Sequence, residues 1–278
     1  MATVIQSEVR KVVRCLIITD SRGKRLDEYL ESHGQDNLDS HRLNIIAEVS
    51  IQPGLKLEHC RREITRLCLR HRTPFDLIIL TAGICSLTDR DAQNRTLSYC
   101  NRAKKDNIVE WIDSLIAEFQ DRLHIATIAP ADLHKYSASP HNAGPVDINQ
   151  YLEQQKNLTT DCQEINDHII AININRRQPT IPWAKQCMLT SKKRDKRTKR
   201  LRTITKFCAN HLYDGLHPDE HLRDVWFKLV VQHIAKVTTQ EDEDQGSQDE
   251  SAQESQEESS QEEGAAGDTW NFKRPRTS

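Results

Sequence analysis

The stretch Val12–Thr19, with the sequence VVRCLIIT, decides the fold. It is a short apolar run rich in β-branched residues, which is typical of a strand buried on both faces of a sheet. Three later stretches are also strand candidates: Arg42–Ile51, Asp76–Ala82 and His124–Ala129. Segments with helical periodicity alternate with them: Leu57–Leu69, Ile108–Leu123, Asp161–Ile174 and His221–Val237.

Strands that alternate with helices along the chain predict a mostly parallel sheet covered on both faces. We therefore expect an α/β fold, a three-layer α/β/α domain with a flavodoxin-like sheet of about five strands. In such sheets the functional groups gather just beyond the carboxyl ends of the strands. These ends point to four segments: Asp20–Gly23, Gln52–Leu55, Gly83–Thr88 and Pro130–His134.

Charge is distributed unevenly along the 278 residues, whose formal net charge is −2. Residues 241–278 hold 12 acidic and 3 basic side chains, which leaves 29 acidic and 36 basic side chains before them. This last part consists mainly of Gln, Ser, Glu and Asp, so it cannot bury enough apolar surface to offset the entropy of ordering. We expect one domain over residues 1–237 and a disordered acidic tail over residues 238–278.

The eight cysteines are scattered and include no CxxC pair. This pattern favours reduced thiols, and hence a cytoplasmic or nuclear protein, over a disulfide framework. No stretch approaches the length of a membrane span. His59, Cys60, Cys68 and His71 share one predicted helix, but their spacing is not that of a zinc knuckle, so no metal or other cofactor is expected.

Three short segments contain residue types that support acyl-transfer chemistry. Ser21 follows the first strand, where either a nucleophile or, with Asp20, a plain helix cap is expected. Gly54 follows a proline and permits positive φ close to a ligand, although most such pairs are simple turns. Asp214 precedes His217 by three residues in a loop with Gly and Pro, where a carboxylate can orient an imidazole.

Together these segments resemble the SGNH hydrolase superfamily, the GDSL-type esterases, over roughly Val12–Val237. Thr19-Asp20-Ser21 matches the Gly-Asp-Ser block with Thr in place of Gly, and Asp214, His217 and Pro218 match the last block. The resemblance implies Ser21 as nucleophile, His217 as general base and Asp214 as orienting acid. It also implies an oxyanion hole formed by Ser21, Gly54 and the residue at the position of Cys85.

Cys85 departs from that family, which has an asparagine donor at this position. A thiol donates only weakly, and losing one oxyanion donor costs about a hundred- to a thousand-fold in turnover. Besides a structural interaction protein recruited through its acidic tail, two interpretations therefore stay open. One is an intracellular serine hydrolase acting on a small ester, and the other is a catalytically silent module of the same fold that binds nucleic acid or protein, derived from a mobile element.

A basic run, Lys192–Lys206, holds nine Lys or Arg side chains and one Asp. It is expected to form a surface loop or short helix. Most such runs are simply solvated, but this density of charge also suits a nucleic-acid backbone or a nuclear import signal.

Overall fold

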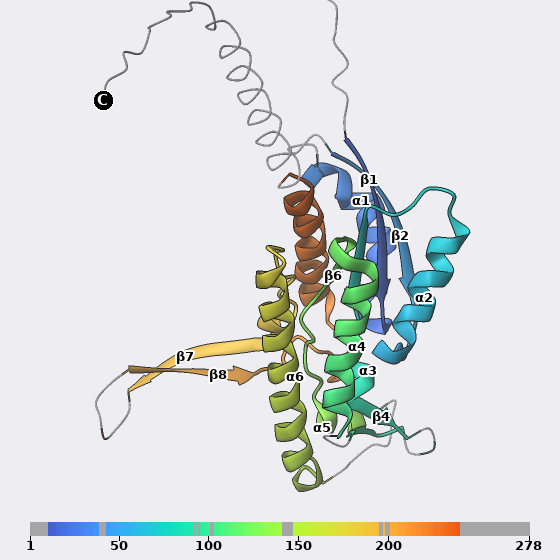
Figure 1. Ribbon diagram of the computed structural model, residues 1–278. Helices are drawn as coiled ribbons and strands as arrows, with labels where there is room; N and C mark the ends of the chain where they lie inside the picture. Colours follow the sequence, from blue (N-terminus) through green and yellow to red (C-terminus); the bar gives the residue numbers. More distant parts are fainter. Residues whose placement is uncertain are drawn as a thin grey trace, which may run out of the picture. The chain divides into compact units, whose positions relative to one another are not determined.

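In the computed structural model, β1 spans Lys11–Thr19 in the interior of a parallel four-stranded sheet (Figure 1). The structure describes residues 11–38, 43–91, 93, 95–100, 103–140, 147–194, 197 and 201–239. Contacts between Cα atoms group Met1–Val237 as one unit and Thr238–Ser278 as another. The predicted acidic tail lies outside the described residues beyond Thr239, and the fold below is that of the first unit.

The strand order of the main sheet is β2-β1-β3-β6, and every pairing is parallel. The partners of β1 in this sheet are β2 (Leu43–Ile51), β3 (Leu77–Thr81) and β6 (Leu123–Ile125). A parallel bridge between Ala126 and Ile181 adds a short fifth position beside β6. This is the flavodoxin-like order, so the predicted α/β class and parallel sheet are confirmed.

Helices cover both faces of this sheet, and alternate side chains of β1 divide the core between the two faces. Leu16 and Ile18 pack with α2, α4 and α6, whereas Cys15 and Ile17 pack with α1 and the last helix. These helices are α1 (Leu26–Leu38), α2 (Leu57–Arg70), α4 (Ala103–Phe119), α6 (Asn149–Asn175) and a last helix over residues 220–237 of this unit. Both faces of β1 are therefore buried, as the VVRCLIIT run predicts.

Two indole rings fix the last helix to the loop that follows α6. The Trp183 and Trp226 rings stack with centroids 4.6 Å apart and an interplanar angle of 6°. Each indole N–H donates to the backbone carbonyl of the other residue, over 3.3 and 3.1 Å. Both side chains are buried, so each polar N–H has an acceptor where no water reaches it.

Short elements complete the unit and lie mostly in its connecting segments. They are the 3₁₀ helices η1 (Ser21–Gly23), η3 (Gln120–Arg122) and η4 (Ala184–Cys187), the short helices α3 (Ile84–Leu87) and α5 (Leu133–Ser137), and the hairpin strands β4 (Thr88–Arg90) and β5 (Leu97–Tyr99). The predicted third helix begins earlier than expected, because α6 starts at Asn149 rather than Asp161.

The two ends of the basic run, Lys192–Arg194 and Leu201–Lys206, form strands and not a loop or short helix, so the prediction is wrong for these described parts. These ends belong to an antiparallel hairpin of β7 (Met188–Arg194) and β8 (Leu201–Phe207), whose strands project away from the helices (Figure 1). The strands contain Thr190, Thr203, Ile204 and Thr205, and β-branched residues favour extended backbone. The high charge of the run hid this preference for a strand in the sequence.

Candidate active site

Ser21 lies directly beyond the carboxyl end of β1, at the first position of η1. The Asp20 side chain caps this 3₁₀ helix by accepting the backbone N–H of Arg22 over 2.9 Å. Asp20 is thus a cap, but of η1 and not of a helix beginning near Lys24, since α1 begins at Leu26. It leaves the hydroxyl of Ser21 available to other partners.

A tight loop before the last helix contains Asp214 and His217. Asp214 Oδ1 accepts the backbone N–H groups of Leu216 and His217, over 2.9 and 2.7 Å. Gly215 between them has a φ of +88°, a backbone conformation that residues other than glycine rarely adopt. The loop thus fixes the carboxylate of Asp214 against its own backbone.

The fold brings Ser21, His217 and Asp214 into one series of hydrogen bonds. Ser21 Oγ lies 2.9 Å from His217 Nε2, and His217 Nδ1 lies 2.7 Å from Asp214 Oδ2. Because an ionised Asp214 can only accept, it holds the proton on Nδ1 and leaves Nε2 free to accept from the Ser21 hydroxyl. The parallel sheet places these residues together although 196 positions separate Ser21 from His217.

The electrostatics of Asp214 favour its ionised form. Desolvation, the largest single effect, raises its pKa, but hydrogen bonds from the His217 ring and from the backbone N–H groups of His217 and Leu216 together outweigh it. The net result is a pKa below the usual value for Asp. Asp214 is therefore a carboxylate at neutral pH, as the tautomer of His217 requires.

A buried ion pair supports the turn that holds Ser21. Arg22 and Asp20 are 2% and 0% exposed, with Arg22 Nη2 3.2 Å from Asp20 Oδ2. Arg22 Nη1 also donates to the carbonyl of Ala129 over 2.8 Å, and the guanidinium lies 5.9 Å from the centroid of Trp226. No pattern in the sequence indicates this pair, since charged neighbours are usually solvated.

Tyr213 is a second neighbour of the site that the sequence did not indicate. Its ring stacks on His217 with centroids 5.9 Å apart and an interplanar angle of 25°. Its backbone N–H donates to the carbonyl of His217 over 2.9 Å. Tyr213 therefore restrains both the ring and the backbone of His217, and no motif of the sequence points to it.

Gly54 has the positive φ expected for its turn, at +76°. It is exposed, and a Cβ built on it would meet nothing within 4 Å. In the part of the chain that the structure describes, the backbone N–H groups of Ser21 and Gly54 donate to no protein acceptor. Both donors are therefore available to a ligand.

Cys85 is half-buried on α3, close enough to Asp20 and Arg22 for their charges to affect it. Burial and, to a lesser extent, Asp20 raise the pKa of this thiol to about 11, against smaller lowering effects of Arg22 and Lys56. It is thus a neutral thiol at neutral pH. The neighbouring Ser86 is buried and accepts the backbone N–H of Leu57 over 2.8 Å, so its oxygen serves the start of α2.

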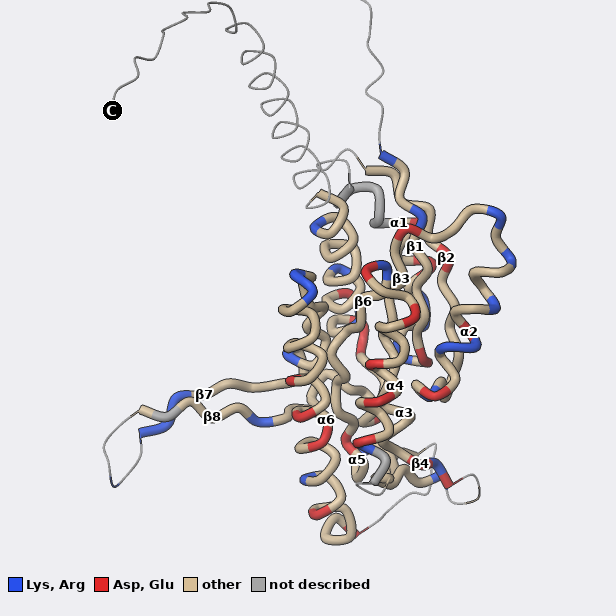
Figure 2. Tube along the Cα trace, in the orientation of Figure 1, with Lys and Arg blue, Asp and Glu red and all other residues tan. Residues whose placement is uncertain are grey.

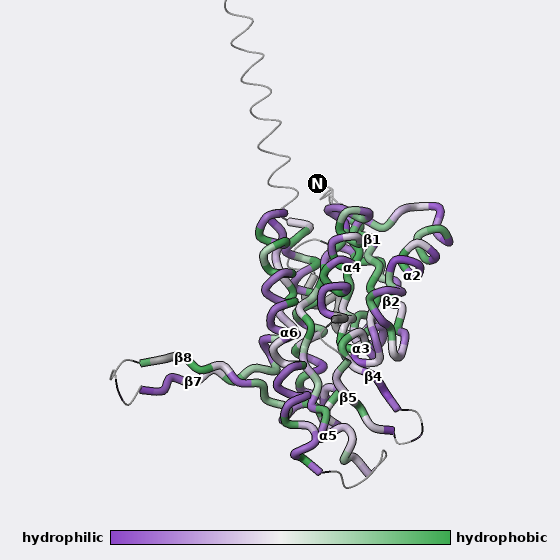
Figure 3. Tube along the Cα trace, turned by 60° about the horizontal axis from the view of Figure 1, so that its bottom comes forward, coloured by the Kyte–Doolittle hydropathy of each residue, from purple (hydrophilic) through white to green (hydrophobic). Residues whose placement is uncertain are grey.

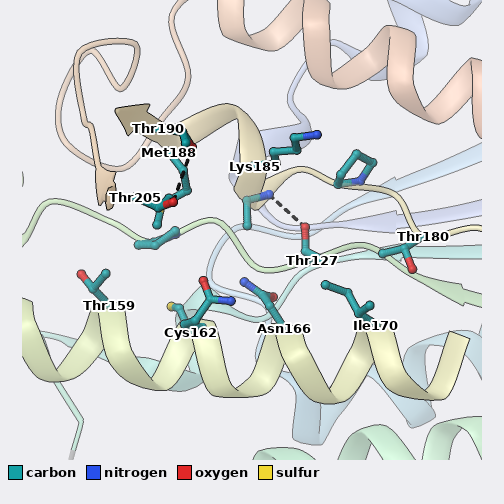
Figure 4. A pocket seen from close by; sticks show the side chains of 14 residues that line it. Thr127, Thr159, Cys162, Asn166, Ile170, Thr180, Lys185, Met188, Thr190 and Thr205 are labelled. Carbon is teal, nitrogen blue, oxygen red and sulfur yellow. Dashed lines mark hydrogen bonds between the residues drawn. The ribbon is translucent and has the colours of Figure 1, made fainter. Parts of the chain in front are cut away.

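Two cavities flank the base of the β7–β8 hairpin, and neither is lined by Ser21, Asp214 or His217. The first, about 450 Å³, lies between α6 and the hairpin, with Asn166, Lys185 and Thr190 in its wall (Figure 4). The second, about 460 Å³, is lined by Asp132, Lys206 and neighbouring residues. These cavities are separate features from the Ser21–His217–Asp214 series.

Among the described residues, no group of three or more His, Cys, Asp or Glu side chains is arranged to hold a metal ion. In the same part of the chain, no helix is both long and apolar enough to cross a membrane.

Comparisons with known proteins give likenesses to solved structures only. No protein-family model and no curated protein matches the chain. It is similar to a lipase/acylhydrolase from Enterococcus faecalis, at 14% identity and a TM-score of 0.48, over 81% of this chain and 96% of that one. It is also similar to the acetyl xylan esterase AlAXEase, at 13% identity and a TM-score of 0.48, over 81% and 99% of the two chains. The strand order of the main sheet is flavodoxin-like, and Ser21 follows β1 after one intervening residue, Asp20.

Proposed function

We propose that the chain is a serine hydrolase that cleaves a small ester through an acyl-enzyme intermediate. The observation that supports this most directly is the hydrogen-bonded series from Ser21 Oγ to His217 Nε2 and from His217 Nδ1 to Asp214 Oδ2, with distances of 2.9 and 2.7 Å. A nucleophile, a base and a group that orients the base within hydrogen-bond reach are the requirements of this chemistry.

In the proposed reaction, Ser21 Oγ attacks the ester carbonyl carbon while its proton passes to His217 Nε2. The carbonyl π pair moves onto oxygen and forms a tetrahedral oxyanion. When this collapses, the bond to the alcohol oxygen breaks and the alcohol leaves with the proton from His217. Water then repeats the sequence on the acyl-serine, and the acid and free Ser21 result. The proposal needs no metal or organic cofactor.

Backbone N–H groups are the proposed donors to the oxyanion. Those of Ser21 and Gly54 have no protein acceptor among the described residues, and each can donate without breaking a hydrogen bond. The thiol of Cys85 is proposed as a weak third donor. Its raised pKa, about 11, supports this role, because a thiolate would repel the oxyanion whereas a neutral S–H can donate.

An intracellular setting is part of the same proposal. It is supported by the eight cysteines, all of which are free thiols and five of which are buried. Free thiols persist in reducing compartments.

A fluorophosphonate probe tests the proposal, because it phosphonylates a serine only where a base activates the hydroxyl. Wild-type protein is expected to be labelled and to hydrolyse p-nitrophenyl acetate, and Ser21→Ala is expected to lose both properties while retaining the wild-type circular dichroism. Ser191→Ala, which removes an exposed serine on β7, is the matched control and keeps them.

Labelling that persists in Ser21→Ala would contradict the assignment of the nucleophile. A folded wild-type chain that takes no label would contradict the hydrolase itself. It would favour instead a non-catalytic module of the same fold, the alternative that the weak donor Cys85 keeps open.

A further inference from the structure

The hairpin of β7 and β8 has no role in the proposed hydrolysis, and its strands are rich in exposed cations. Lys192, Lys193, Arg194 and Lys206 are all exposed, and no acidic residue occurs in either strand. Figure 2 shows Lys and Arg positions along the projecting hairpin, and Figure 3 shows that the distal part of β7 is hydrophilic. In the described part of the chain none of the four forms an ion pair with an acidic side chain. Their charge is thus available to an anionic partner.

The strand register places these cations on both faces of the hairpin. Lys192 pairs with Thr203 and Arg194 with Leu201, which puts both cations on one face because side chains two positions apart share a face. Lys193 lies on the other face. Lys206 shares that face, because its cross-strand partner is Leu189, and Leu189 is four positions from Lys193. A flat partner, such as a membrane surface, would meet only one of these faces.

A groove with phosphates on both walls would meet both faces at once. A β-ribbon with side chains on each face is about 10 Å thick, judged from the spacing of packed sheets. The major groove of B-form DNA is about 12 Å wide and admits a two-stranded ribbon, whereas the minor groove is about 6 Å wide. The major groove of duplex RNA is deep and too narrow for side chains to read.

We propose that the β7–β8 hairpin inserts into the major groove of duplex DNA, where its two basic faces contact the phosphates of opposite walls. The exposed hydroxyls of Ser191 and Thr203 supply further donors to phosphate oxygens. This proposal does not depend on the proposed hydrolysis, because none of these residues belongs to the Ser21–His217–Asp214 series.

Binding of the full chain to fluorescein-labelled 20-base-pair DNA, measured by anisotropy at several salt concentrations, tests the proposal. A variant with Gln at all four cations (Lys192→Gln, Lys193→Gln, Arg194→Gln, Lys206→Gln) is expected to bind at least about tenfold more weakly. The slope of log K against log salt falls by about 0.9 for each phosphate that the variant no longer neutralises, hence by about 3 to 4 for four cations. Fluorophosphonate labelling or circular dichroism of the variant shows that it is folded.

Two control proteins sharpen the comparison. The first control replaces four exposed cations on α2, on the loop after it and on α6 (Arg62→Gln, Arg70→Gln, Arg72→Gln, Lys156→Gln). This control is expected to bind DNA as the wild type does. In the second, Lys192→Arg, Lys193→Arg and Lys206→Arg preserve the charge, and binding is retained. Methyl green, a major-groove ligand, is expected to compete with the protein, whereas netropsin, a minor-groove ligand, is not.

Equally weakened binding in the α2 and α6 control would overturn the proposal, because general charge would then explain it. Equal affinity for 20-base-pair RNA or for a 20-nucleotide single strand would overturn it too, since neither offers the wide groove. An unchanged salt slope in the hairpin variant would likewise show that these cations do not bind phosphates.

Discussion

Cys85 is the residue at which this chain departs most from the chemistry proposed for it. The thiol lies near the end of β1, within range of the charges of Asp20 and Arg22, and burial raises its pKa to about 11. It is therefore neutral but a poor hydrogen-bond donor. An amide at the same position would donate more strongly to a developing oxyanion.

We accordingly expect Cys85→Asn to raise kcat for p-nitrophenyl acetate, by up to about a hundredfold, since one oxyanion donor contributes a factor of about 10² to 10³. Cys85→Ala is expected to lower kcat only slightly, because it removes a weak donor. Steady-state kinetics of the two variants checks both effects. A Cys85→Asn enzyme no faster than wild type would show that this side chain does not face the oxyanion.

At the scale of elements, the loop between β8 and the last helix depends on its packing against α5. The backbone N–H of Asp132 donates to the carbonyl of Gly215 over 2.7 Å. A Cβ built on Gly215 would lie 2.5 Å from the carbonyl oxygen of Asp132 and 2.6 Å from the backbone nitrogen of Tyr136. Only glycine allows this approach, and the approach positions Asp214 and His217.

Gly215→Ala is therefore expected to lower the free energy of unfolding by more than the left-handed backbone alone would cost, which is about 1 to 2 kcal/mol. It is also expected to reduce kcat, because the loop must move away from α5. Gly54→Ala is the matched control for stability, since Gly54 has a similar positive φ, +76°, but open space around it. Urea unfolding of both variants makes the comparison, and equal decreases would contradict the role of the close approach.

At the scale of the whole molecule, a buried histidine pair joins β6 to the last helix. His233 Nε2 lies 3.0 Å from His124 Nδ1, and the side chains are 5% and 2% exposed. Desolvation, and to a lesser extent the charge of Arg176, lowers the pKa of His124 to about 4. Desolvation, and to a lesser extent the charges of His124 and Lys236, lowers the pKa of His233 to about 3. Both values lie below the 6.5 of an unperturbed histidine.

Because these pKa values are lower in the folded chain, the unfolded chain binds more protons between about pH 6.5 and pH 3. Stability from the pair is full above pH 6.5 and is lost as the pH falls through this window. Urea midpoints are therefore expected to drop as pH falls from 7.5 to 4.5, and the drop should be smaller in a His124→Gln/His233→Gln variant. His59→Gln/His221→Gln, which removes two exposed histidines, serves as the control. A variant as pH-sensitive as wild type would exclude the pair as the cause.

The layers and the ends of the strands follow from the amino-acid sequence alone. Apolar runs such as Val12–Thr19 predict buried strands because burial on both faces leaves no polar position, and Ser21, Gly54, Asp214 and His217 stand out because turns demand particular residue types. The structure brings Ser21, Asp214 and His217 together as their motifs suggested.

Features that depend on how the surrounding elements pack came from the tertiary structure. It paired Arg22 with Asp20 and with the carbonyl of Ala129, stacked Tyr213 on His217, and folded the basic run into a hairpin. Periodicity reports which side of an element is apolar, but an ion pair between neighbours, a ring contact or a strand register is selected by the packing that surrounds it.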